Sequence, residues 1–168
     1  MEHLRFPVGR HVPKTSYSAD EIRGFVDTLE AFPGLMRQVC ASATAEKLAT
    51  PYRPGGWTLR QLVHHVADSH LNAYIRIKLA LTEDIPTIKP YDQDAWSQTA
   101  DSLEAPVEWS LSILDGLHAR WVYLLRSLEP ADLDLRVRHP EFDEPMRIVD
   151  FLALYDWHCR HHLAHARL

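Results

Sequence analysis

The sequence predicts an all-α fold, a four-helix bundle that forms one domain over residues 1–168. Two observations lead to this prediction. Four stretches carry apolar residues at the three- and four-residue spacing of an amphipathic helix, and loops rich in proline and glycine separate them. The chain is also long enough, with 46% apolar residues, to bury one core without disulfides. Helices of this kind are stable when their apolar faces pack together, as in a bundle.

The first predicted helix follows an N-terminal arm. Residues 1–17 contain two prolines and a glycine, and we expect them to lie extended over the surface. Ser18 and Glu21 have the spacing of a capping box, so the helix begins there. The pair Pro33-Gly34 interrupts the pattern and predicts a kink or a break. The buried side before this point carries five apolar residues: Ile22, Phe25, Val26, Leu29 and Phe32.

The second predicted helix follows a loop over residues 50–56. A capping box of Thr58 and Gln61 marks its start, and it runs to about Leu81. One face is apolar and carries Leu59, Val63, Val66, Tyr74 and Ile77. The opposite face is polar and carries His65, Asp68, Ser69, Asn72 and Arg76. Because a polar stripe on an amphipathic helix is usually its solvated side, this helix alone does not identify His65 as a ligand.

A long loop, two further helices and a short excursion complete the chain. Residues 84–106 contain three prolines and two aromatic residues. A connection of this length and content is more often a packed, functional loop than a flexible one. The third helix begins at Val107 and ends by Pro130. We expect a hairpin-like excursion over residues 135–147, after which the fourth helix begins near residues 148–150 and runs to the end of the sequence.

Histidines concentrate in the fourth helix. Four of the eleven in the chain, at positions 158, 161, 162 and 165, fall within an arc of roughly 100° on one side of a helix. Apolar residues just upstream project onto the same arc, so this stripe should point into the protein. Two imidazoles four residues apart can bind one ion, and neutral imidazole suits zinc, nickel, iron or copper. Both His158/His162 and His161/His165 have that spacing.

Spacing argues against several other kinds of site. The sequence contains no HExxH motif, no Glu-x-x-His pair and no glycine-rich phosphate loop, which disfavours a zincin, a di-iron bundle and a nucleotide site. Cys159 is a poor partner for a neighbouring histidine base, because adjacent helical residues point about 100° apart. A mononuclear three-histidine site remains. The alternative at this point is a set of hydrogen-bonded histidines without a metal.

Composition and charge argue against two classes of partner, nucleic acids and membranes. The 18 basic and 23 acidic residues give a net charge of −5 with no basic stripe, so we do not expect nucleic acid as a partner. The first residues lack the apolar core of a signal peptide, and no apolar run has membrane-spanning length, so we do not expect a membrane either. The two cysteines, Cys40 and Cys159, suggest no disulfide framework. These features predict a cytoplasmic protein.

Several motifs together resemble those of a known family. The chain resembles the YfiT-like branch of the DinB-like superfamily, over nearly its whole length. The matching segments are residues 56–72 (GWTLRQLVHHVADSHLN), 74–76 (YIR), 81–84 (LTED), Pro86, 89–91 (KPY) and 157–162 (WHCRHH). The resemblance implies a four-helix bundle in which three histidines hold one divalent metal ion. One of them comes from a His-x-x-Asp run on the second helix and two from a His-x3-His run on the fourth.

Carried over residue by residue, the resemblance selects the ligands. The first motif falls on His65 with Asp68, and the second on His158 and His162. The implied cofactor is one divalent ion held by these three histidines, with zinc or nickel expected first. Asp68 is expected to orient a ligand imidazole.

We do not expect the remaining histidines of the two motifs to be metal ligands. His161 and His165 should line the pocket or bond elsewhere, and His64 should face a different direction from His65. The polar stripe of the second helix then lines the metal pocket instead of facing solvent.

The resemblance implies two activities. Members of this branch are labelled metal-dependent hydrolases, whereas related proteins are thiol S-transferases that use bacillithiol or a similar small thiol. An ion held by three neutral imidazoles would activate a water or a thiol. We favour the transferase, because the motif-bearing helices offer no obvious glutamate base beside the metal.

The expected partners are therefore a small-molecule thiol and an electrophile, and neither Cys40 nor Cys159 is expected to be the nucleophile. The resemblance also allows a homodimer. A stress-related protein that binds metal or a small molecule without turnover is the third hypothesis. It predicts metal binding without thiol-dependent chemistry.

Overall fold

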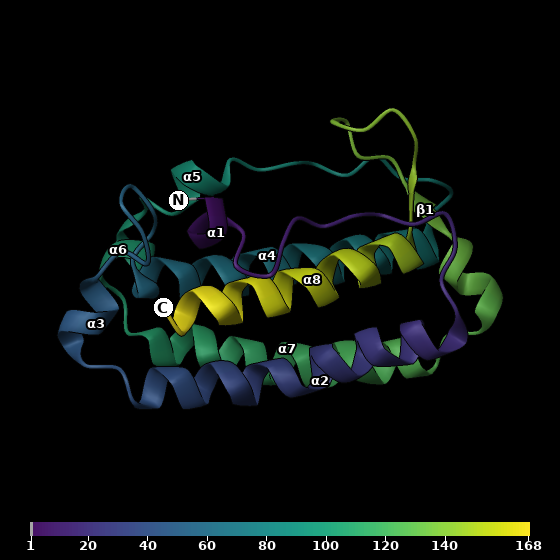
Figure 1. Ribbon diagram of the computed structural model, residues 1–168. Helices are drawn as coiled ribbons and strands as arrows, with labels where there is room; N and C mark the ends of the chain where they lie inside the picture. Colours follow the sequence, from purple (N-terminus) through teal and green to yellow (C-terminus); the bar gives the residue numbers. More distant parts are fainter. Residues whose placement is uncertain (1) are drawn as a thin grey trace.

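Four long helices form the body of the computed structural model, which describes residues 2–168 (Figure 1). They are α2 (Ala19–Ala41), α4 (Leu59–Thr82), α7 (Val107–Arg126) and α8 (Ile148–Ala166). Their apolar faces enclose one continuous core, in which Leu29, Leu62 and Leu114 are fully buried. The predicted all-α four-helix bundle is confirmed.

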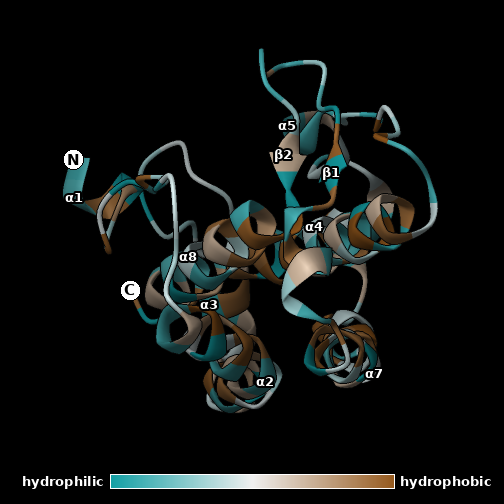
Figure 2. Cartoon of the chain, turned by 90° about the vertical axis from the view of Figure 1, so that its right-hand side faces the viewer, coloured by the Kyte–Doolittle hydropathy of each residue, from teal (hydrophilic) through white to brown (hydrophobic). Residues whose placement is uncertain are grey.

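The order of the helices around the bundle differs from their order in the sequence. Helix α2 packs against α7 and α8, and α4 packs against the same two helices. Consecutive long helices α2 and α4 therefore stand at opposite corners, as the end view in Figure 2 shows. In Figure 1, α4 and α7 run from left to right while α2 and α8 run from right to left. Helices α4 and α8 are thus antiparallel neighbours, which places the start of α4 beside the end of α8.

Both predicted capping boxes are present. The Ser18 hydroxyl accepts from the Glu21 N–H at 3.2 Å, and the Glu21 carboxylate accepts from the Ser18 N–H at 2.8 Å. Thr58 and Gln61 make the same reciprocal pair at the start of α4. Each box satisfies backbone donors that the first turn of a helix leaves free. The starts of α2 and α4 are therefore set by their own sequences.

The break expected at Pro33-Gly34 does not occur. Helix α2 continues through Pro33, which is buried. A proline inside a helix removes one backbone N–H, here the donor that would reach the carbonyl of Leu29. That carbonyl accepts instead from Nδ1 of His118 on α7, at 2.6 Å. A side chain of a neighbouring helix thus replaces the missing bond, and packing keeps the helix continuous.

The connections contain more helix than the sequence indicated. The arm expected to be extended over residues 1–17 begins with a helical turn, and the long loop over residues 84–106 contains two short helices. The short segments are α1 (Glu2–Arg5), α3 (Ala45–Ala49), α5 (Gln93–Trp96), α6 (Ala100–Glu104) and the 3-10 helix η1 (Pro130–Asp134). Asp92 caps α5 by accepting from the N–H groups of Asp94 and Ala95. Thr44 caps α3 in the same way by accepting from the Lys47 N–H, and helical periodicity does not detect such local caps.

The excursion before the last helix is a short hairpin, as predicted. Strand β1 (Arg136–Val137) pairs antiparallel with β2 (Met146–Arg147), with Val137 opposite Met146. The fully buried Val137 fixes the hairpin to the bundle. Within residues 2–168, none of the helices has both the length and the apolar character needed to cross a membrane.

Candidate metal centre

Three histidines meet where the first half of α4 faces the last half of α8. His65, His158 and His162 each offer one ring nitrogen, and these nitrogens lie within 4.8 Å of one another. The ring centroids of His65 are 5.5 Å from His158 and 5.1 Å from His162, and those of the α8 pair are 4.4 Å apart. Antiparallel packing of α4 and α8 brings together residues far apart in the sequence. The structure therefore assembles the three residues that the family motifs selected.

His65 lies inside the protein, so the polar stripe of α4 is not its solvated side. Its side chain is 5% exposed, and the Trp57 ring packs over it with centroids 4.4 Å apart. Further along the stripe, Ser69 bonds the Tyr155 hydroxyl of α8 at 3.1 Å. The loop over residues 84–106 covers the start of the helix, where Gln61 donates to the Ser97 carbonyl at 3.0 Å. A polar stripe usually faces solvent, but here α8 and Trp57 cover it at His65 and Ser69, and the loop covers the start of the helix.

A cavity of about 400 Å³ opens in front of the three histidines. In Figure 1, α1 and α5 lie over this end of α4 and α8. The walls combine aromatic rings with charged groups: Phe6, Tyr52, Trp57, Trp157, Arg5, Arg53 and Asp94. The arm and the two predicted loops therefore supply most of the wall, while the helices supply the histidines.

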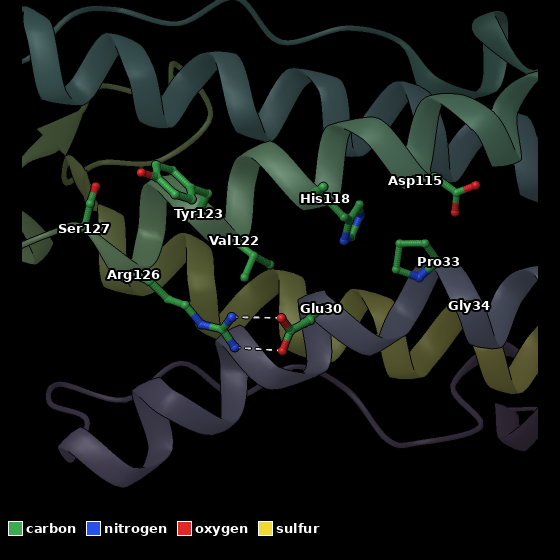
Figure 3. A pocket seen from close by; sticks show the side chains of 10 residues that line it. Glu30, Pro33, Gly34, Asp115, His118, Val122, Tyr123, Arg126 and Ser127 are labelled. Atoms are coloured by element: carbon green, nitrogen blue, oxygen red, sulfur yellow. Dashed lines mark hydrogen bonds and ion pairs between the residues drawn. The ribbon is translucent and has the colours of Figure 1, made fainter.

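A larger hollow of about 750 Å³ lies between α2 and α7. Figure 3 shows that its walls carry the Glu30–Arg126 ion pair, joined by two hydrogen bonds of 2.8 and 2.7 Å. His118 is the histidine at this hollow, and no candidate metal cluster among residues 2–168 lies there. The smaller cavity is therefore the candidate site.

Burial keeps the three imidazoles neutral at pH 7. It lowers the pKa of His65 to about 4, with the nearby His161 adding a smaller effect. Burial, and after it the neighbouring histidines, also lowers the pKa of His158 and His162 well below the usual value. A neutral ring carries one N–H and one lone pair, and metal ions bind that lone pair. Three neutral, convergent rings without a carboxylate are a donor set that fits a divalent cation.

His158 and His162, the two candidate ligands on α8, contact other histidines behind them. Nδ1 of His158 contacts Nε2 of His70 at 3.0 Å. Nδ1 of His162 contacts Nδ1 of His165 at 3.4 Å. Within residues 2–168, no hydrogen bond to protein engages Nε2 of His158 or His162. That nitrogen of each ring is therefore free for a ligand.

The other histidines of the two motifs divide between the cavity and the surrounding packing. His64 points away from His65, since its Nδ1 contacts the Ser110 hydroxyl at 2.8 Å and its Nε2 contacts the Ala105 carbonyl at 3.1 Å. His161 lines the cavity and stacks on Trp157 with ring centroids 4.3 Å apart.

A second group with metal-ligand spacing overlaps the first. It consists of His161, His162 and His165, so it shares one ring with the set that includes His65. The Nε2 of His165 contacts the Leu4 carbonyl at 2.9 Å, and its Nδ1 contacts His162. Because both nitrogens of His165 have protein partners, this second group is the poorer ligand set.

Asp68 lies half-buried on the same stripe as His65. Burial, and secondarily the neighbouring Asp101, raises the pKa of its carboxyl to about 6. Among the described residues, no hydrogen bond joins this carboxylate to a ligand histidine, and His70 occupies the position behind His158. The expected role of Asp68 in orienting a ligand imidazole stays a prediction.

Sequence reasoning missed His70 and His118. His118 lies in the apolar stripe of α7 between Leu117 and Trp121, and its side chain is 2% exposed. His70 is fully buried at 0%. A polar residue inside an apolar helical stripe is a signal that it has a buried partner, and this signal was available in the sequence.

The two cysteines lie outside the cavity. Cys159 is 1% exposed and borders a groove between α8 and α2. Burial raises the pKa of Cys40 to about 11, with Glu108 adding to the rise, and it raises the pKa of Cys159 well above the usual value. Both thiols are therefore protonated at neutral pH and are poor nucleophiles.

Comparisons with known proteins agree with this description. The family model described as the DinB superfamily matches residues 28–166. A protein of Bacillus mycoides (strain KBAB4), provisionally named a metal-dependent hydrolase, is 47% identical over 165 residues, covering 98% of this chain and 94% of the relative. YfiT of Bacillus subtilis (strain 168) has the same provisional name and is 44% identical over 163 residues, covering 97% of this chain and 92% of YfiT.

A solved structure also matches. The structure of YfiT from Bacillus subtilis superimposes with a TM-score of 0.95 and covers 98% of this chain and 94% of that one. YfiT is described as a probable metal-dependent hydrolase with an unusual four-helix bundle topology.

Proposed function

The chain belongs to the DinB superfamily, and we propose that it is a metal-dependent enzyme whose single divalent cation, zinc or nickel, is held by His65, His158 and His162. One observation supports this most. Three neutral imidazoles from two antiparallel helices converge within 4.8 Å at the inner end of a cavity. The provisional names of the relatives point to the same class of enzyme.

The donor set suggests what the cation would do. Because no carboxylate is among the three ligands, a bound cation keeps its full charge and favours the deprotonated form of a thiol or a water at neutral pH. Trp57 and Trp157 line the cavity and offer apolar surface beside the three histidines.

We favour transfer of a small-molecule thiol to an electrophile as the reaction. The sulfur forms a bond to the electrophilic carbon, the leaving group departs with its electron pair, and the thiol proton goes to solvent. Since Cys40 and Cys159 are buried outside the cavity, the sulfur must come from a bound molecule. Arg5 and Arg53 at the cavity wall suit a thiol or electrophile that carries an anionic group.

Hydrolysis of an ester or amide is the second candidate. The provisional names of the relatives favour it. A hydrolase needs a base for the attacking water, and Asp94 is the carboxylate among the residues that line the cavity. Asp94 is exposed at the rim, on the short helix α5, and not buried beside the three histidines. This position is why we rank hydrolysis second.

An assay with metal-loaded protein separates these candidates. A model electrophile whose conjugation changes its absorbance is mixed with a panel of small thiols, and ester hydrolysis is followed without thiol. We expect conjugation that requires both thiol and metal, and its loss in His158→Ala. His64→Ala is the matched control, because His64 is a buried histidine of α4 that points away from the cavity.

Three results decide between the hypotheses. Thiol-independent hydrolysis at a comparable rate would overturn the transferase proposal. Metal binding with neither reaction would favour a protein that binds metal without turnover. Equal activity in His158→Ala and the wild type would exclude the proposed centre itself.

A further inference from the structure

A row of buried histidines crosses the core behind the candidate metal centre. It begins at the Leu29 carbonyl of α2, where Nδ1 of His118 lies 2.6 Å from the oxygen. Nε2 of His118 lies 2.7 Å from Nδ1 of His70. Nε2 of His70 lies 3.0 Å from Nδ1 of His158, a proposed ligand. Two rings, His118 of α7 and His70 of α4, therefore connect a backbone carbonyl of α2 to a proposed ligand on α8.

The first contact sets the direction of every other bond in this row. A carbonyl oxygen only accepts, so Nδ1 of His118 must carry the proton and its Nε2 must carry the lone pair. That lone pair requires Nδ1–H on His70, whose Nε2 then accepts. Nε2 of His70 in turn requires Nδ1–H on His158. Each ring has one N–H and one lone pair only while it is neutral.

The surroundings keep the intermediate rings neutral. Both rings are enclosed by the core, His70 at 0% and His118 at 2% exposure, and burial disfavours the charged form of an imidazole. Phe32 packs against both rings, with centroids 5.3 Å from His70 and 5.7 Å from His118. No acidic side chain bonds to either ring among residues 2–168.

The row exists because of a proline. Pro33 stands four residues after Leu29 and lacks the N–H that would bond this carbonyl in an ordinary helix. In Figure 3, Pro33 and the His118 ring lie close together, between α2 and α7. A residue that the sequence marked as a break therefore leaves an acceptor free for the first histidine.

A second, shorter row ends at the other ligand of α8. Nε2 of His165 lies 2.9 Å from the Leu4 carbonyl at the end of α1, so it carries the proton. Nδ1 of His165 then accepts from Nδ1 of His162, at 3.4 Å. Through His165, the Leu4 carbonyl of the N-terminal arm thus sets the hydrogen bond made by His162. The Leu29 carbonyl of α2 does the same for His158 through two intermediate rings.

We propose that the Leu29 and Leu4 carbonyls, acting through His118–His70 and through His165, fix the tautomers of the two ligand rings on α8. Both rings then present the Nε2 lone pair to the cavity. His70, His118 and His165 are positioning residues in this proposal, since each acts through a hydrogen bond to another ring. The proposal deepens the proposed function, since it concerns the same metal centre. Such partners behind metal ligands typically change metal affinity by about 10- to 100-fold.

The first test reads the tautomers directly in metal-free wild-type protein. Long-range ¹H–¹⁵N correlation spectra of histidine-labelled protein distinguish Nδ1–H from Nε2–H rings. We expect Nδ1–H at His118, His70, His158 and His162, and Nε2–H at His165. An Nε2–H ring at His70 or His158 would overturn the proposal, whatever the protein catalyses. Correct tautomers without metal binding would leave it intact and overturn the proposed function instead.

The second test measures zinc affinity by competition with a chromophoric chelator, and the cobalt absorption spectrum of the same variants. His70→Leu removes the acceptor behind His158 and should weaken zinc binding by about 10- to 100-fold. His70→Gln keeps an acceptor oxygen and a donor, so it should restore most of the affinity and the cobalt spectrum. Equal losses in the two variants would contradict a hydrogen-bonding role.

A core variant separates positioning from general stability. Ile148→Ala removes a fully buried side chain at the start of α8, about 15 Å along the helix from His158. It should lower folding stability and leave zinc affinity and the cobalt spectrum unchanged. If Ile148→Ala weakened zinc binding as much as His70→Leu, the loss would reflect destabilisation and the proposal would fail.

Discussion

The buried His118 should make the metal-free fold sensitive to mild acid. Burial depresses the pKa of this ring from 6.5 to about 4, against the opposing effects of the Leu29 carbonyl and Asp115. Between these pH values, His118 therefore binds a proton in the unfolded chain but not in the folded one. The stability contribution is complete above about pH 6.5 and is lost as the pH falls toward 4. His118 is 2% exposed, so solvent screens this effect little.

The size of the effect follows from the two pKa values. One pKa unit corresponds to about 1.4 kcal/mol, so a ring with pKa values of 6.5 unfolded and about 4 folded loses about 2 kcal/mol of stability between pH 7 and pH 5. This is a substantial share of the roughly 5–15 kcal/mol that stabilises a domain. Other buried histidines add to the loss in the wild type, so the contribution of His118 must be measured as a difference.

Urea unfolding at pH 7 and pH 5, with a chelator present, measures that difference. In His118→Leu, which has no ring to titrate, the fall in unfolding free energy between the two pH values should be smaller than in the wild type by about 2 kcal/mol. Leu114→Ala is the control from the same helix. It should be less stable by about 2–5 kcal/mol at both pH values, with the pH dependence of the wild type. An unchanged pH dependence in His118→Leu would refute the reasoning that this ring is buried and neutral.

Three further predictions concern the site. His158→Ala should abolish binding of one equivalent of zinc, measured by metal analysis after dialysis, whereas His161→Ala should leave it largely intact; the reverse result would select the other histidine pair. Activity should survive Cys40→Ala and Cys159→Ala, and the alkylation of Cys40 by iodoacetamide at pH 8 should be slow, because burial raises the pKa of that thiol to about 11. Chelation should abolish activity and added divalent metal should restore it, and full activity in the presence of a strong chelator would exclude a metal-dependent reaction.

Local patterns in the sequence were sufficient to predict the long helices. The capping boxes at Ser18 and Thr58 and the apolar spacing within each helix depend on neighbours a few residues away, and the structure has them as expected. Of the kink or break that these patterns predicted at Pro33, the break does not occur, because the bond that replaces the missing N–H comes from His118, 89 positions from Leu29. They also missed α1, α3, α5 and α6, which are too short to show a period.

In the candidate site, too, some features follow from local sequence patterns and others depend on residues far apart in the chain. The spacing of His158 and His162 is a property of one helix and was visible in the sequence, but two pairs on α8 had that spacing. His65 lay on a stripe that helix periodicity alone assigns to solvent, and only the family motifs pointed to it. The sequence, through spacing and family motifs, therefore identified histidines that could bind a metal ion. Tertiary structure decided which of them meet, since the antiparallel packing of α4 and α8 places His65 beside His158 and His162. It also decided which nitrogen each ring on α8 presents, because hydrogen bonds to the distant Leu29 and Leu4 carbonyls set the direction.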